Sequence, residues 1–172
     1  MADIADALTR RAALVAVGGA LVAAAAPAAA QSAATFRAIT VDTAPLANLG
    51  ARRDAELIRR LLQQELPAAF AGRITGARSA PTLLVRITAL SLASYAGQGG
   101  GGSGGGGATV DTDYLEGEAL VMPAGSRTAI LRVPMLSAVP SSSAGAWYQP
   151  DNEQRRIAYI TSHFAGWLAK KV

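Results

Sequence analysis

Apolar residues recur with two different periods along this chain, and the changes of period mark the expected elements. Alternation of apolar with polar or small residues is typical of β-strands. It occurs in four segments, residues 35–42, 82–94, 114–122 and 127–136. The second segment has apolar residues on both faces, with Leu83 on one and Leu84 and Leu90 on the other. This segment is therefore expected to be a central strand.

Two further segments have apolar residues at helical spacing. The first begins at Ala51, and its apolar side consists of Leu57, Ile58, Leu61, Leu62 and Leu66. Asn48 is a candidate cap for this helix. Pro67 should end or bend the helix, because proline lacks an amide hydrogen, although a further turn over residues 68–70 stays open. We expect an amphipathic helix that covers one face of a sheet.

The last helix begins near Asp151, which together with Gln154 fits a capping box. Its apolar stripe consists of Ile157, Ile160, Phe164, Trp167 and Leu168. Lys170 and Lys171 come at its carboxyl end, where positive charge is favourable. This helix should also pack on the sheet.

Turn residues connect the strands. Residues 123–126 read Pro-Ala-Gly-Ser, so the third and fourth strand segments should form a hairpin. Pro134 cannot donate a hydrogen bond, which favours an edge position for the fourth strand. Residues 45–50 and 141–145 interrupt the periodic pattern and are expected to be loops.

The order strand, helix, three strands, helix predicts an α+β fold. We expect a two-layer sandwich, in which a four-stranded, mostly antiparallel sheet has both helices on one face. Between the second and third strands, nine of the eleven residues 97–107 are glycine. Because glycine gives the backbone great freedom, this tract is expected to be a flexible loop within a single domain, residues 31–172.

Residues 1–30 have the three parts of a signal peptide. Arg10 and Arg11 provide a positive flank, residues 12–26 are apolar, and alanines at 28–30 precede Gln31. The apolar run is short for a membrane anchor. The paired arginines also resemble a twin-arginine signal, although Ala13 stands where that signal has phenylalanine, so the general secretory route and the twin-arginine route both stay open. We expect cleavage and a periplasmic or secreted protein without a stable membrane span.

Composition narrows the chemistry. The 172-residue chain contains no cysteine, which excludes disulfides, thiolate zinc sites, cysteine nucleophiles and iron–sulfur clusters. Its net charge of +4 is mild. Arginines at 52, 53, 59 and 60 could meet anionic lipid or nucleic acid, but Asp54 and Glu56 lie between them, which favours a solvated helix face. No nucleic-acid partner is expected.

Candidate catalytic patterns are weak. Residues 101–105 match the formula of a hydrolase nucleophile elbow, but no strand-turn-helix surrounds them. His163 is the one histidine, so a serine–histidine pair would require it to swing away from its helix, and a helix-surface position is favoured. The acidic residues Asp111, Asp113, Glu116 and Glu118 lack the calcium-loop pattern. Glu116 and Glu118 could instead pair with Arg127 or Arg132 on a neighbouring strand.

Three aromatic residues near loops are candidates for partner contact. Trp147 and Tyr148 follow a serine-rich loop, and Tyr95 borders the glycine tract. Such residues either pack back on the sheet or meet a partner.

Four segments carry a resemblance: ITVDTAPL at 39–46, AELIRRLLQQEL at 55–66, TLLVRITALSL at 82–92 and YLEGEALV at 114–121. On these, the chain resembles uncharacterised exported proteins of alphaproteobacteria. The order of elements is similar to that of small outer-membrane assembly lipoproteins and of auxiliary lipoproteins of lipid-transporting ABC systems. This chain lacks their lipidated cysteine, and an analogy of topology transfers no site residues.

These observations favour a non-enzymatic accessory or binding protein of the cell envelope, which acts through contact with a protein or lipid assembly. No cofactor or metal is expected. A small-ligand carrier is one alternative, and it would need a cavity between sheet and helices. The other is a carboxylate-based hydrolase, in which Asp42, Asp54 or the acidic residues at 111–118 would have to converge. The oligomeric state and the identity of the partner stay open.

Overall fold

The computed structural model describes residues 34–94, 112–146 and 148–172. The chain divides into two compact units, Met1–Gln31 and Ser32–Val172, and all described residues belong to the second. The predicted signal peptide and the glycine tract at 97–107 lie outside the described residues. Their predicted roles stay predictions.

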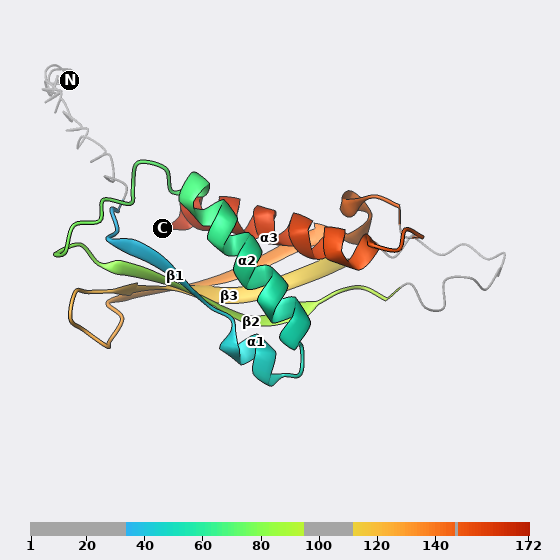
Figure 1. The fold of residues 1–172 in the computed structure, drawn as a ribbon, viewed down its shortest axis with the longest axis horizontal. Helices are drawn as coiled ribbons and strands as arrows, with labels where there is room; N and C mark the ends of the chain where they lie inside the picture. The colour runs from blue at the N-terminus through green and yellow to red at the C-terminus, as the bar shows by residue number, and fades with distance from the viewer. Residues whose placement is uncertain (1–33, 95–111, 147) are drawn as a thin grey trace, which may run out of the picture. The chain divides into compact units, whose positions relative to one another are not determined.

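The second unit is a two-layer α+β sandwich, as the sequence predicts. Its sheet has the order β1-β2-β3-β4, with β1 parallel to β2 and the other neighbours antiparallel. Figure 1 shows that α2 and α3 lie on the same face of this sheet. The elements are β1 (Ala38–Asp42), α1 (Ala44–Asn48), α2 (Arg52–Ala69), β2 (Thr82–Ser91), β3 (Thr112–Met122), β4 (Leu131–Pro140), the 3-10 helix η1 (Ser141–Ala144) and α3 (Asn152–Lys171).

A single hydrophobic core lies between the sheet and the helices. The apolar stripe of α2 buries Ile58, Leu62 and Leu66, and every second residue of β2 from Leu83 to Ile87 is fully buried. Along α3, the predicted stripe is buried with one exception, since Trp167 is 46% exposed. The pattern thus identified the core faces correctly, but it placed Trp167 wrongly.

Several boundaries differ from the expectation. Residues 45–50, expected as a loop, contain α1, because Pro45 is tolerated in a first helical turn and Leu46 packs into the core. For α2, which ends at Ala69, the structure shows the alternative in which the helix continues past Pro67. β4 spans Leu131–Pro140 and therefore starts and ends later than predicted.

The predicted helix caps are wrong in detail. Ala51, not Asn48, occupies the N-cap position of α2 and makes no side-chain cap. Asp151 does occupy the N-cap position of α3, but its carboxylate accepts a hydrogen bond from Arg155 at 2.7 Å and does not cap a backbone amide. Asp151 thus pairs with Arg155, one helical turn further along, in place of the predicted capping box with Gln154.

A β-bulge changes which side of the sheet the end of β2 faces. The register with β3 shifts between Ile87 and Ala89, so that Leu90 pairs with Leu115. Cross-strand partners share a face, and Leu115 is fully buried. The bulge therefore turns Leu90 toward the core, against the strict alternation expected from the sequence.

The opposite, helix-free face of the sheet has a ladder of charges, one from each strand. Arg86 on β2 donates to Asp42 on β1 at 3.0 Å and to Glu118 on β3 at 3.3 Å. Arg132 on β4 reaches the second oxygen of Glu118 at 3.1 Å. The predicted pairing of Glu118 with Arg132 is confirmed.

One buried hydroxyl of α3 gives a first testable prediction. Thr161 is fully buried, and its Oγ1 has no hydrogen-bond partner. We expect Thr161→Val to raise the free energy of unfolding by about 1 kcal/mol, because an unsatisfied polar atom is removed at nearly constant volume. Urea denaturation measures this, and the exposed Ser162→Ala serves as a neutral control. A loss of stability on Thr161→Val would contradict the prediction.

Candidate functional site

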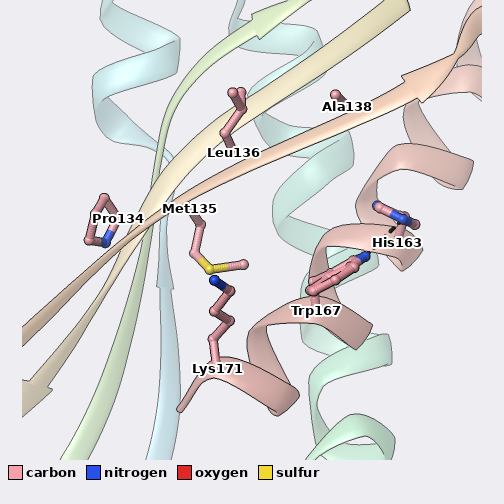
Figure 2. A pocket seen from close by; sticks show the side chains of 7 residues that line it. All are labelled: Pro134, Met135, Leu136, Ala138, His163, Trp167 and Lys171. Atoms are coloured by element: carbon pink, nitrogen blue, oxygen red, sulfur yellow. Dashed lines mark hydrogen bonds between the residues drawn. The ribbon is translucent and has the colours of Figure 1, made fainter.

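The most suggestive concave site lies where α3 meets the free edge of the sheet. Four residues of β4 (Pro134, Met135, Leu136 and Ala138) and three of α3 (His163, Trp167 and Lys171) line a groove of about 470 Å³. We call it the α3–β4 groove, and Figure 2 shows it from close by. Since β4 is an edge strand, as Pro134 predicted, no further strand covers the groove from that side.

Spacing along α3 places the helix side of the groove. His163, Trp167 and Lys171 follow one another at intervals of four residues, which puts them on one flank of a helix. The last turn of α3 is held in place by Arg73, whose Nη1 donates to the carbonyl oxygen of Ala169 at 2.9 Å. The same guanidinium lies over the ring of Phe70, 4.7 Å from its centroid. The position of Lys171 is therefore fixed from outside the helix.

His163 is the polar centre of this flank, and both of its nitrogens are engaged. The indole Nε1–H of Trp167 donates to Nε2 of His163 at 3.0 Å, and Ser137 Oγ lies 2.7 Å from Nδ1. An indole nitrogen can only donate, so Nε2 must accept. A neutral imidazole then carries its hydrogen on Nδ1, which donates to Ser137 Oγ.

This arrangement matters because serine and histidine together suggest nucleophilic catalysis. His163 meets Ser137 without swinging from its helix, contrary to the expectation from sequence. A general base, however, must accept the serine proton, and here the nitrogen facing Ser137 holds a hydrogen. Ser137 is also only 2% exposed. The pair is thus arranged to orient Trp167 and not to activate a nucleophile.

The tautomer of His163 can be measured directly. Because the chain has a single histidine, its two side-chain nitrogen signals are unambiguous in ¹⁵N NMR. When the imidazole of His163 is uncharged, we expect its hydrogen on Nδ1, because Nε2 accepts the hydrogen bond from Trp167. Trp167→Phe removes that donor and should allow the two neutral tautomers to mix. Predominance of the Nε2–H form in the unaltered protein would contradict this geometry.

The charges around the groove are positive. Lys171 lines it, and Lys170 Nζ lies 5.3 Å from the centroid of the Trp167 ring, within cation–π range. None of the seven lining residues is acidic. Within the described part of the chain, no ion pair involves Lys171. The groove therefore combines an apolar wall with an unneutralised cation.

A second polar cluster lies in the interior at the other end of α3. Asp113, 1% exposed, accepts hydrogen bonds from Arg156 Nε at 2.8 Å, from Ser141 Oγ at 2.7 Å and from the amide of Ala93 at 3.0 Å. Burial alone would raise the pKa of Asp113, but these hydrogen bonds and the charge of Arg156 outweigh it and lower the pKa. The cluster ties β3, η1 and α3 together.

The structure separates the acidic residues that the sequence grouped. Asp113 points into the core, Glu118 faces the helix-free side, and Asp111 lies outside the described residues. Among the residues that the structure describes, no group of three or more potential ligands could hold a metal ion. Arg53 and Arg60 line a separate hollow with Asp54 and Glu153, so acidic groups accompany these arginines, as the interleaved sequence indicated.

The predicted contact residues are only partly described. Tyr95 and Trp147 lie outside the described residues. Tyr148 is 72% exposed and has an interaction of its own within the chain. A partner contact at these three positions stays a prediction. Sequence reasoning missed the groove, although the four-residue spacing of His163, Trp167 and Lys171 was a visible signal.

Comparison with known proteins adds little to this geometry. No family model matches the chain, and no curated protein matches it. A crystal structure of a candidate lipoprotein from Caulobacter crescentus has a TM-score of 0.42 and 14% sequence identity, and the match covers 78% of this chain and 83% of that chain. A likeness this weak carries no argument about function.

No helix among the described residues is both long and apolar enough to cross a bilayer. What fold and groove define together is a two-layer α+β domain with an open, cationic and apolar groove at one sheet edge.

Proposed function

We propose that this protein is a non-enzymatic accessory or binding protein of the cell envelope, and that the α3–β4 groove is its contact site. The predicted signal peptide supports the location. The observation that carries the proposal is the groove itself, in which Trp167 is held at the surface by His163 and Lys171 forms no ion pair with any described residue. Exposed tryptophan and a rim of charge are typical of sites that bind partners.

The alternative of a carboxylate-based hydrolase has less support. Such an enzyme needs carboxylates that converge in one cleft. Asp42 is engaged by Arg86 on the helix-free face, Asp54 lies on α2, and Asp113 is buried against Arg156. These three carboxylates occupy different parts of the fold. The alternative of a small-ligand carrier is compatible with the groove.

Site-specific photo-crosslinking in living cells tests the proposal. A photoreactive amino acid at position 167 should crosslink to an envelope component, because Trp167 lines the groove and is 46% exposed. The matched control is position 159 on the same helix, where Tyr159 is 44% exposed and does not line the groove. Crosslinks from position 167 that are absent from position 159 would support the proposal. Retention of the protein in the cytoplasm, or identical products from both positions, would contradict it.

A further inference from the structure

The chemistry of the α3–β4 groove suggests what it binds. Its apolar surface comes from Met135 and Trp167, and the one formal charge among its lining side chains is the ammonium group of Lys171. Figure 2 shows the Lys171 side chain extending between the helix and Met135 on the strand. A ligand that matches both parts has a hydrocarbon portion and a negative group at one end. Resting on the proposed function, we propose that the groove binds a single-chain anionic amphiphile, either a fatty carboxylate or an alkyl phosphate.

A peptide strand is a poorer match for the same edge. Peptides that extend a sheet depend on main-chain hydrogen bonds from the edge strand. Pro134 and Pro140 provide no amide hydrogen. Successive main-chain amides of a strand point alternately to its two edges, and these two prolines are six residues apart. The strand therefore loses two main-chain donors along the same edge. The edge thus offers fewer main-chain contacts, while its side chains offer an apolar wall.

A cationic ligand also fits poorly. The face of Trp167 is already approached by Lys170, and no carboxylate lines the groove to neutralise a second cation. A negative headgroup, by contrast, would find Lys171 inside the groove and Lys170 beside it. Charge complementarity therefore selects the sign of the headgroup, and the apolar wall selects the hydrocarbon.

Binding should be measured with soluble amphiphiles below their micelle concentrations. Decyl phosphate and decanoate are the anionic probes, with decyltrimethylammonium and decyl maltoside as cationic and neutral comparisons. Fluorescence of Trp167 is followed in the Trp147→Phe protein, because Trp147 is the other tryptophan. We expect saturable binding of the anionic probes, weaker binding of decyl maltoside and none of the cation. From octyl to decyl phosphate, affinity should rise about fourfold for each methylene that enters the groove.

A matched pair of variants assigns this binding to the groove. Lys171→Gln should weaken decyl phosphate binding roughly three- to tenfold, whereas Arg127→Gln, an equal loss of charge in the exposed β3–β4 turn, should not. Because both side chains are exposed, folding should survive each change.

The outcomes separate this proposal from the broader one. Equal binding of anionic and cationic probes, or equal effects of Lys171→Gln and Arg127→Gln, would overturn the amphiphile proposal. So would flotation with phosphatidylglycerol vesicles in the absence of any monomer binding, since that result indicates a membrane surface and not a single ligand. A crosslink from position 167 to an envelope protein would then still support the proposed function. Failure of that crosslink with intact decyl phosphate binding would leave a ligand-binding groove without an envelope partner.

Discussion

Asp113→Ala is expected to lower the free energy of unfolding by about 3–5 kcal/mol. The change removes the carboxylate that Arg156 faces, and Arg156 is itself only 5% exposed. Its positive charge would stay buried without a carboxylate partner from Asp113, although its hydrogen bonds to the hydroxyl of Ser141 and the carbonyl of Ala93 could remain. Chemical denaturation followed by circular dichroism measures the loss.

The matched control uses Arg155, the residue before Arg156 on α3. Arg155 pairs with Asp151 at 2.7 Å, but this pair is at the surface, so Asp151→Ala should cost no more than about 1 kcal/mol. A double change, Asp113→Leu with Arg156→Met, should recover much of the lost stability, because both charges leave the interior together. Equal losses of unfolding free energy for Asp113→Ala and Asp151→Ala would contradict the expectation that breaking the buried ion pair is the more destabilising change.

The same cluster predicts a pH dependence. The folded protein lowers the pKa of Asp113, so this group stabilises the fold at pH values above its unfolded pKa, about 3.9. That contribution is lost as the pH falls below about 4 and passes through the lowered folded pKa. The difference in unfolding free energy between the unaltered protein and Asp113→Asn should therefore shrink between pH 5 and pH 2. A constant difference across that range would contradict it.

Gly117→Ala is the second substitution with a large expected effect. Gly117 lies on the core side of β3, opposite Ile87 at the bulge. A Cβ at this position would collide with the carbonyl oxygen of Arg86 and would lie 3.3 Å from Cζ of Phe164. The carbonyl oxygen belongs to the backbone of β2, which cannot move aside as the end of a flexible side chain can. We therefore expect Gly117→Ala to lower the free energy of unfolding by at least about 3 kcal/mol.

A second glycine provides the control. Gly166 lies inside α3, and a Cβ there would meet no atom within 4 Å. Gly166→Ala should therefore stabilise the protein by about 0.5–1 kcal/mol, through the higher helix propensity of alanine. Thermal unfolding of the two variants should thus shift in opposite directions. Changes of the same sign would mean that the close approach of β2 to Gly117 is not as described.

The apolar periodicity of the sequence was sufficient to predict the layers of the fold. Burying the stripes of α2 and α3 requires a common apolar surface, and Leu83, Val85 and Ile87 provide it. The bulge at residue 88 was not predictable, because its cause is spatial. The shift lies beside Gly117, where an added Cβ would meet both the carbonyl oxygen of Arg86 and the ring of Phe164, a residue from far along the chain.

The groove was harder to predict for a related reason. Trp167 falls within the apolar stripe of α3 by spacing alone, so the sequence favours its burial. Only the fold shows that the indole of Trp167 donates to His163 and so sets its tautomer, and that Ser137 on β4 faces the other ring nitrogen. The buried pair of Asp113 and Arg156 is equally invisible, since 42 residues separate the two partners in sequence.

The ladder of Asp42, Arg86, Glu118 and Arg132 has a consequence for how the strands find their alignment. β1 has only five residues and pairs in parallel with β2, which gives it few main-chain contacts to define a register. A slip by one residue would turn Asp42 toward the apolar interior and leave Arg86 without that partner. The misaligned sheet would be destabilised on both faces at once. The ladder therefore favours the observed register of β1 with β2 over a register shifted by one residue.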